Sequence, residues 1–289
     1  MERFRKDQKK SPLGSRLTSN LGSGSTWREL PFEDFQWFIK EVKKKFNLDL
    51  TGYKPQRVKR RIEILIRKWG KSSYREYFDL IVKDEKAQKE FLDRLTINVT
   101  EFFRNPEKWD ELKKKYIPEL LKESGSRFKA WSAGCSSGEE PYSLAIVLEE
   151  LRAPTGAKVI ASDIDINILA KARKGAYEER SLVNVPPDIK KKYFDYRDGL
   201  YYVKPNVKAR VTFKRHNLLQ DPFDKNHDLI LCRNVVIYFE MKTKEELYRR
   251  FAEALRPGGI IFVGSTERIF NYRQIGLEVV SPFFYRKVK

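Results

Sequence analysis

The chain has 289 residues, with 59 lysines and arginines against 40 aspartates and glutamates, so its formal net charge is +19. Hydrophobic residues make up 40% and aromatic residues 13%, which is enough for a packed core and excludes wholesale disorder. No apolar run approaches the roughly 18–20 residues of a membrane span, and no apolar segment follows the basic start as a secretory signal would require. We therefore expect a soluble, cytoplasmic protein without membrane insertion.

The sequence contains few residues that could bind a metal ion or form a disulfide. The only cysteines are Cys135 and Cys232, and the only histidines are His216 and His227. They are widely spaced and match neither a disulfide framework nor a zinc-ligand pattern. We expect no metal.

The first third of the chain divides into a tail and a helical domain. Residues 1–30 are rich in serine, glycine and basic residues and predict a disordered basic tail. From 31 to 105 apolar residues recur every three or four positions, as in Phe35, Phe38 and Val42, and predict helices throughout. Pro55 suits a first helical turn and Gly70 suits a stop. Residues 31–105 therefore predict a small all-α domain.

One segment of this domain is strongly basic. Between Lys54 and Lys71 eight basic residues face one acidic residue, giving +7 in 18 residues. At about 100° per residue, four of the cations share one helix flank; these are Arg57, Arg60, Arg61 and Lys68. Such a patch attracts nucleic acid, anionic lipid or a carboxylate-rich protein.

The rest of the chain alternates strands with helices. Residues 106–126 predict a connecting helix, and 127–289 carry strands at 128–133, 159–162, 228–232 and 260–264 with helices at 141–151, 166–177 and 243–255. This order predicts an α/β, Rossmann-like fold with a doubly wound parallel sheet. Two pieces depart from it. Residues 196–213 predict an inserted antiparallel β-hairpin, with strands at 200–203 and 209–213, and 277–285 predict a closing antiparallel pair.

The first strand runs directly into WSAGCSSGEEP at residues 131–141. Small residues let this turn approach a ligand closely, but G-x-G-x-x-G and the phosphate-binding G-x-x-x-x-G-K-[ST] are both absent. Asp163 ends the second strand 24 residues beyond Glu139 (163 − 139), near the roughly 20-residue offset of a ribose-binding carboxylate. A ribose site without a phosphate site indicates a nucleoside cofactor, and S-adenosylmethionine fits.

Three motifs in order resemble the CheR family of chemotaxis methyltransferases. They are TINVTEFFRNP (96–106), the 131–141 turn and CRNVVIYF (232–239), and the resemblance covers about 31–289. It implies methyl transfer from S-adenosylmethionine to glutamates on the cytoplasmic methylation helices of chemotaxis receptors, in sensory adaptation. The products are glutamyl methyl esters and S-adenosylhomocysteine, and we expect a monomer.

The resemblance also implies roles for individual residues. The implied cofactor contacts are Asn98, Thr100, Arg104, Glu139, Asp163, Asn217, Leu218, Arg233 and Asn234. Tyr238 and Arg104 are the implied catalytic residues. For the substrate, the basic segment supplies Lys54, Arg57, Arg60, Arg61 and Lys68.

Two other interpretations stay open at this point. A nucleic-acid methyltransferase would suit the sequence pI near 9.7, although RNVVIY at 233–238 lacks the Asn/Asp-Pro-Pro-aromatic run typical of those enzymes. The second alternative is a non-enzymatic protein, in which the fold only senses the cofactor while the helical domain binds a partner. Within the family, some members hold a receptor's C-terminal pentapeptide on a longer, glycine-bearing hairpin loop. The terse stretch 196–202 suggests that this chain works without that tether.

Overall fold

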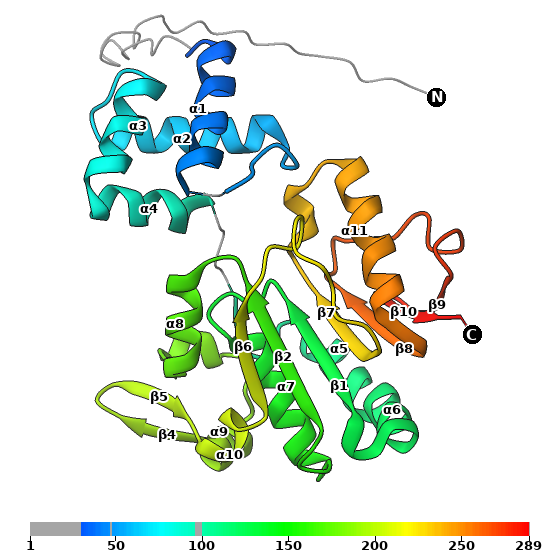
Figure 1. Cartoon of the computed structure of the whole chain (residues 1–289). Coiled ribbons are helices and arrows are strands. Elements are labelled where there is room, and N and C mark those ends of the chain that lie inside the picture. Colours follow the sequence, from blue (N-terminus) through cyan, green and yellow to red (C-terminus); the bar gives the residue numbers. More distant parts are fainter. Residues whose placement is uncertain (1–29, 47, 96–99, 289) are drawn as a thin grey trace, which may run out of the picture.

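The computed structural model describes residues 30–46, 48–95 and 100–288. The predicted tail therefore lies almost wholly outside the described residues. A helical domain rests on a larger α/β domain (Figure 1).

The all-α domain is confirmed. It contains α1 (Phe32–Phe46), α2 (Pro55–Lys68), α3 (Tyr74–Lys83) and α4 (Glu85–Leu95). Pro55 begins α2 at a position where its missing N–H costs nothing, and the Ser73 side chain caps α3 by accepting the Glu76 N–H. The four apolar faces share one core around the fully buried Phe38 and Phe91.

The α/β domain is built on one seven-stranded sheet, which confirms the predicted fold class. Its strands are β1 (Lys129–Ala133), β2 (Lys158–Asp163), β6 (Val211–Arg215), β7 (His227–Cys232), β8 (Leu255–Val263), β9 (Leu277–Ser281) and β10 (Phe284–Lys287). Their order is β6-β2-β1-β7-β8-β10-β9. The first five run parallel, and β10 pairs antiparallel with β8 and β9, as the predicted closing pair requires.

Helices cover both faces of this sheet because alternate strand residues point to opposite sides. On one face Ala130 shares a core with α5 (Pro106–Glu111), α6 (Ile117–Ser124) and α7 (Glu139–Glu150). On the other face Trp131 packs with α11 (Met241–Ala254). A π-helical turn, Leu112–Tyr116, joins α5 to α6, and α8 (Ile166–Lys174) follows β2.

The inserted β-subdomain exists, but its predicted strand pairing is wrong. The hairpin is formed by β4 (Phe194–Arg197) and β5 (Leu200–Val203), with β3 (Ala176–Tyr177) on the other side of β5. The segment predicted as the second hairpin strand is β6, which pairs in parallel with β2. Pro205 does not turn the chain back but begins α10 (Pro205–Lys208), since proline fits the first helical turn. A further short helix, α9 (Pro187–Tyr193), precedes β4.

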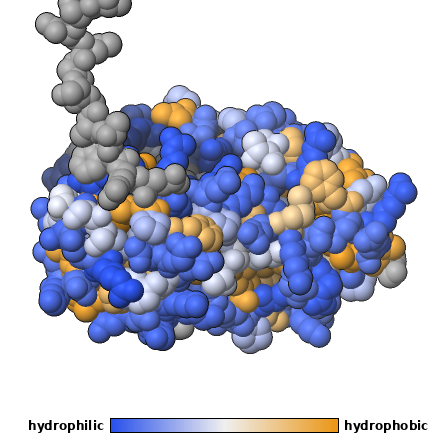
Figure 2. All heavy atoms as spheres, turned by 90° about the horizontal axis from the view of Figure 1, so that it is seen from above, coloured by the Kyte–Doolittle hydropathy of each residue, from blue (hydrophilic) through white to orange (hydrophobic). Residues whose placement is uncertain are grey.

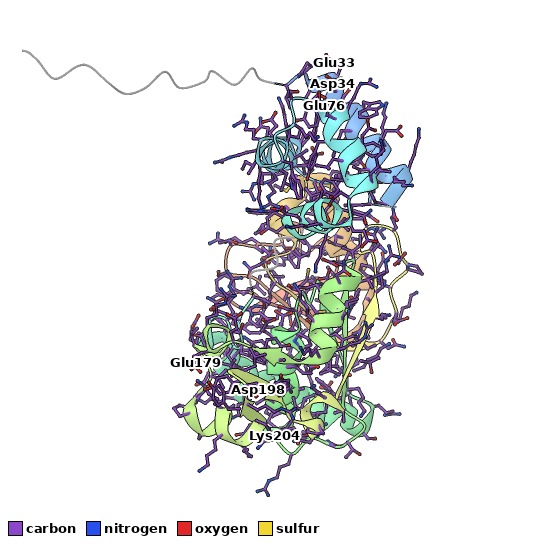
Figure 3. All side chains as sticks on the ribbon, turned by 90° about the vertical axis from the view of Figure 1, so that its left-hand side faces the viewer. Glu33, Asp34, Glu76, Glu179, Asp198 and Lys204 are labelled. Atoms are coloured by element: carbon purple, nitrogen blue, oxygen red, sulfur yellow. The ribbon has the colours of Figure 1, made fainter. Side chains whose placement is uncertain are left out.

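The helical domain and the β-subdomain lie at opposite ends of the molecule. Figure 3 shows Glu33, Asp34 and Glu76 at one end and Glu179, Asp198 and Lys204 at the other. Viewed from above, on the helical-domain side, the surface is mostly hydrophilic with small separated hydrophobic patches (Figure 2). This face therefore offers charge to a partner more than a continuous apolar patch.

Candidate active site

A cavity opens where four parallel strands end. It is lined by residues directly after β1, β6 and β7 and by the last residue of β2; these are Gly134, His216, Arg233 and Asp163. The strand order reverses between β1 and β7, and this switch point is where open α/β sheets bind ligands.

The turn after β1 is shaped by close backbone approach. Gly134 has φ +80°, and a Cβ there would lie 2.6 Å from the Val235 side chain in the loop after β7. Glycine is therefore required for the two loops to meet. The N–H groups of Gly134 and Cys135 both donate to the Ser162 carbonyl oxygen at 2.9 Å, which fixes the turn against β2.

Asp163 dominates one side of the cavity. Its Oδ2 accepts the Ser136 N–H at 2.9 Å and its Oδ1 accepts the Asp165 N–H at 3.1 Å. Each carboxylate oxygen has a second lone pair, so the group retains capacity for ligand hydroxyls. Burial raises the pKa of Asp163, and the two N–H donors lower it. His216 lies beside it, with a buried Nε2 that has no hydrogen-bond partner among the described residues.

Arg233 organises the other side. Its Nη2 donates to the Arg104 carbonyl oxygen at 2.7 Å and to Asn105 Oδ1 at 2.8 Å, and its Nη1 lies 3.6 Å from Glu140 Oε2. Burial raises the pKa of Glu140, whereas the Arg233 charge and a hydrogen bond from Ser132 lower it. Arg233 thus joins the first and third sequence motifs to the turn after β1.

The loop after β7 is held by a buried carboxylate. Glu267 accepts N–H groups from Asn234 (2.8 Å), Val236 (3.0 Å) and Gly264 (2.8 Å). Burial raises the pKa of Glu267, and these backbone donors lower it. Three bonds to one group fix the path of the loop that carries Tyr238 into the cavity.

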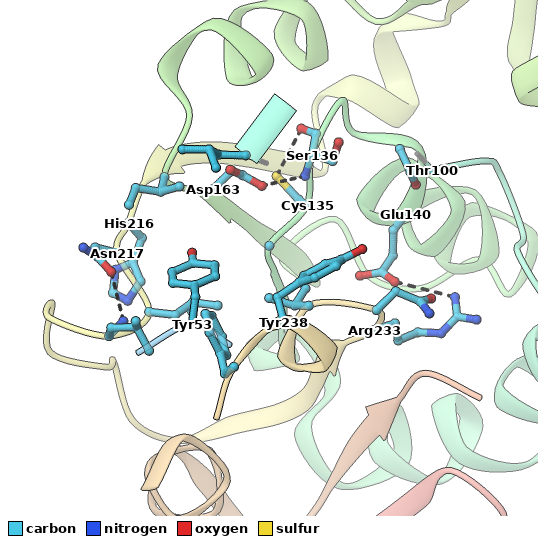
Figure 4. A pocket seen from close by; sticks show the side chains of 18 of the residues that line it. Tyr53, Thr100, Cys135, Ser136, Glu140, Asp163, His216, Asn217, Arg233 and Tyr238 are labelled. Carbon is cyan, nitrogen blue, oxygen red and sulfur yellow. Dashed lines mark hydrogen bonds and ion pairs between the residues drawn. The ribbon is translucent and has the colours of Figure 1, made fainter. Parts of the chain in front are cut away.

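The cavity brings together most of the predicted site residues. Those on its wall are Thr100, Arg104, Asp163, Asn217, Leu218, Arg233, Asn234 and Tyr238. Figure 4 shows Asp163, His216 and Asn217 on one side and Thr100, Glu140 and Arg233 on the other, with Tyr53 and Tyr238 between them. Asn98 lies outside the described residues.

Glu139 is the exception, because it does not line the cavity and Glu140 does. Helix α7 begins at Glu139, so consecutive side chains point about 100° apart. Glu139 turns toward Ser137 and Ser181, which donate to its carboxylate at 2.7 and 3.5 Å. Burial raises the pKa of Glu139 to about 7.

The structure divides the predicted basic flank of α2. Arg57 and Arg60 are exposed. Arg61 is half-buried, donates to the Leu95 carbonyl oxygen at 3.0 Å and lies over the Tyr238 ring, 4.9 Å from its centroid. Lys68 forms an ion pair with Glu90 on α4.

The flank reaches the cavity through backbone contacts as well. Arg57 Nη1 approaches the Ile237 carbonyl oxygen at 3.4 Å, and the Lys54 N–H donates to the Tyr238 carbonyl oxygen at 2.9 Å. The predicted substrate residues and the predicted catalytic Tyr238 therefore adjoin.

Sequence reasoning missed several residues of the site. Glu101, Glu140 and His216 line the cavity next to predicted positions, so a search of neighbours would have found them. Glu267 gave no signal, because its role depends on backbone N–H groups more than thirty positions away. Tyr53 comes from the helical domain, where no motif indicated a cofactor contact.

The family can now be stated. Residues 33–96 match the CheR methyltransferase all-alpha domain, and residues 98–281 match the CheR methyltransferase SAM-binding domain. The chain belongs to the CheR methyltransferase family.

Relatives agree over almost their whole length. The chain is 40% identical over 255 residues to the chemotaxis protein methyltransferase of Listeria innocua, covering 88% of this chain and 97% of the relative. It is 35% identical over 268 residues to that of Borreliella burgdorferi, covering 88% and 94%, and 32% identical over 273 residues to that of Salmonella typhimurium, covering 88% and 93%.

S-adenosylmethionine is the cofactor of this family's matched domain, and the cavity suits it. Carboxylates line both sides of a cavity that must accept a cationic molecule with ribose hydroxyls. Within the described ranges, no group of three or more His, Cys, Asp or Glu side chains is placed to hold a metal ion. No helix in those ranges is long and apolar enough to cross a membrane.

Proposed function

We propose that this CheR-family enzyme transfers the methyl group of S-adenosylmethionine to glutamate side chains of chemotaxis receptors, giving glutamyl methyl esters. The relatives named chemotaxis protein methyltransferase support a chemotaxis substrate. The observation that carries the choice of an acidic acceptor is the contact between the basic flank of α2 and Tyr238, where Arg61 lies 4.9 Å from the ring centroid.

Cofactor placement follows from the two sides of the cavity. Asp163 would accept hydrogen bonds from the ribose hydroxyls, with Asn217 and Leu218 on the same side for the base. On the other side, Glu140 would balance the cofactor's ammonium group and Arg104 would bind its carboxylate. The bound cofactor supplies an electrophilic methyl group on a positively charged sulfur.

No general base is needed at this site. A glutamate carboxyl group has a reference pKa near 4.3, so it is already an anionic nucleophile at neutral pH. What remains is to orient one carboxylate oxygen in line with the methyl group and to exclude water, and alignment of this kind contributes several kcal/mol. Tyr238 is placed for that task, since it lies in the cavity between its two sides.

Charge brings the acceptor to this point. Arg57 and Arg60 are exposed on α2, and Arg57 contacts the Tyr238 loop, so an acidic receptor helix would be attracted to this surface. Arg61, which is half-buried against Tyr238, is closest to the reacting carboxylate. We propose that the flank docks the helix and that Arg61 orients the glutamate.

The direct test is transfer of a radiolabelled methyl group from S-adenosylmethionine to a cytoplasmic receptor fragment, with mixed RNA and DNA as a parallel acceptor. We expect label on the receptor that mild base releases as methanol, because methyl esters hydrolyse and methylated bases do not. Base-stable label on nucleic acid, with none on the receptor, would refute the proposal. The nucleic-acid alternative finds no support in the relatives reported above.

The remaining parts of the proposal concern setting and assembly. We propose that the enzyme acts in the cytoplasm, on the methylation helices of receptors, and that it works as a monomer. A single peak at 34.2 kDa in light scattering of the protein without receptor fragment would agree with a monomer.

A further inference from the structure

A short strap joins the helical domain to the cofactor cavity. It comprises Gly52, Tyr53 and Lys54, directly before α2, and it pairs antiparallel with the end of the Tyr238 loop. The Lys54 N–H donates to the Tyr238 carbonyl oxygen at 2.9 Å, and the Glu240 N–H donates to the Gly52 carbonyl oxygen at 3.0 Å.

Gly52 shows how closely the strap is packed. A Cβ at this position would lie 3.1 Å from the Leu219 side chain and 3.3 Å from Thr243 Cγ2. Leu219 lines the cavity and Thr243 belongs to α11, so the strap is seated between the cofactor site and the helix that follows the loop. The backbone pairing of the strap and its close packing at Gly52 together fix the direction of the side chain at the following position.

That side chain is Tyr53, and it points into the cavity. Successive residues of an extended chain face opposite sides, so Tyr53 turns away from its neighbours in the strap. Its ring packs edge-to-face on Phe239 with centroids 4.8 Å apart. Figure 4 shows it beside Asn217 and His216, on the Asp163 side of Tyr238.

The Tyr53 hydroxyl is also suited to donate a hydrogen bond. Burial, and then the negative charge of Asp163, raise the pKa of Tyr53 to about 12. The hydroxyl therefore keeps its proton at neutral pH and is close enough to Asp163 to interact with its charge. Within the described residues, no side chain accepts a hydrogen bond from this hydroxyl. The cavity provides space for a ligand atom that would accept one.

We propose that Tyr53 of the helical domain is a cofactor-binding residue, whose ring covers the nucleoside half of the cofactor and whose hydroxyl donates a hydrogen bond to it near Asp163. The inference rests on the placement of the ribose at Asp163 given under the proposed function. It makes the cofactor site a shared property of both domains. It also links the cofactor to the substrate flank, because α2 begins immediately after the strap.

The test is calorimetric binding of S-adenosylhomocysteine to the full chain. Tyr53→Phe keeps the packing on Phe239 and removes only the hydroxyl, and we expect affinity to fall about fivefold. Tyr53→Leu should lower the affinity about tenfold further than Tyr53→Phe does, since it also removes the ring. Tyr196→Phe is the matched control: this tyrosine on β4 is 66% exposed, and its loss should change nothing.

Two further measurements separate the possible failures. Thermal unfolding without ligand should give the same Tm for Tyr53→Phe and the unmodified chain, while the Tm increase on adding S-adenosylhomocysteine should be smaller for the variant. Asp163→Asn should weaken binding at least tenfold. If Asp163→Asn binds normally, the ribose placement is wrong and the inference falls with it.

If Asp163→Asn weakens binding but Tyr53→Phe binds like the unmodified chain, only the role of Tyr53 is refuted, and the tyrosine is a packing residue. Hydrogen exchange gives an independent readout. Bound S-adenosylhomocysteine should slow exchange of the Lys54 and Glu240 amides in the unmodified chain, because it ties the strap to the cavity. In Tyr53→Leu that added protection should be lost; its persistence would contradict the proposal.

Discussion

The cofactor cavity and the basic flank of α2 meet at Tyr238 but are built differently. Around the cavity, buried carboxylates are bound by backbone N–H groups, Asp163 on the wall and Glu267 behind the loop after β7, so the site is rigid before any ligand arrives. On the flank, Arg57 and Arg60 are exposed on α2, and Arg57 makes one long hydrogen bond, 3.4 Å, to the Ile237 carbonyl oxygen. Rigidity suits a cofactor of fixed shape, whereas exposed cations suit a protein surface whose acidic groups vary.

The largest expected effect tests the rigidity of the cavity at Glu267. Glu267→Ala would leave three buried N–H donors unsatisfied and should lower the free energy of unfolding by about 3–5 kcal/mol. Urea denaturation measures the loss. Glu245→Ala, at an exposed carboxylate on α11, should change stability by less than about 0.5 kcal/mol. Equal effects in the two variants would show that the three bonds contribute little.

The next effect concerns Glu139, which is buried without a role on the cavity wall. Its pKa is about 7 in the folded chain against a reference of 4.5, so the folded state holds the proton more tightly than the unfolded state. This favours folding at low pH, and the advantage is lost as pH rises from about 4.5 through 7. Glu139→Gln cannot ionise and should gain about 2–3 kcal/mol relative to the unmodified chain above pH 7.

Urea denaturation at pH 5 and pH 8 measures this difference. The gain from Glu139→Gln should be several times larger at pH 8. The matched control is Glu107→Gln, at an exposed carboxylate in α5, which should show no such pH dependence. A gain that is the same at both pH values would mean that Glu139 is not held in its neutral form.

Mutations on the basic flank should change the KM for receptor and not the stability of the fold. Arg57→Ala with Arg60→Ala should raise the KM for receptor about tenfold, because steering charges are lost, while affinity for S-adenosylhomocysteine stays within about twofold. The increase should shrink at high salt, since exposed charges are screened. Lys40→Ala removes an exposed charge from α1 and serves as the control. Equal losses in receptor and cofactor affinity would refute the division between flank and cavity.

Arg61 sharpens the same comparison. It is half-buried against Tyr238 and bonded to the Leu95 carbonyl oxygen, so it belongs to the boundary between the two regions. Arg61→Ala should lower kcat as well as raise KM, by about tenfold or more in kcat/KM. A change in KM alone would place Arg61 with Arg57 and Arg60 as a docking residue.

Sequence reasoning located the cavity better than its boundaries. Asp163 and the glycine turn were predictable because each lies at the end of a strand, whereas Arg233 was implied only by the family resemblance. Glu139 was predicted as a cofactor contact, but Glu140 lines the cavity in its place, since the sequence does not show where the first turn of α7 begins. Tyr53 was missed and the pairing of β6 was wrong for a common reason: both depend on pairing with segments distant in the chain, which local periodicity does not show.

The smallest expected effect is at the β-subdomain, which we expect not to bind a receptor's C-terminal pentapeptide. Asp198 and Gly199 are the only residues between β4 and β5, and both have positive φ, as a tight two-residue hairpin turn requires. The hairpin therefore lacks the longer loop of family members that bind a receptor's C-terminal pentapeptide. Calorimetry with such a pentapeptide should show no heat, while a methylation-helix fragment should bind.

Because β4 is an edge strand, it could still accept an added strand. Measurable pentapeptide binding would show that the edge alone is sufficient, and the tether-independent interpretation would be wrong.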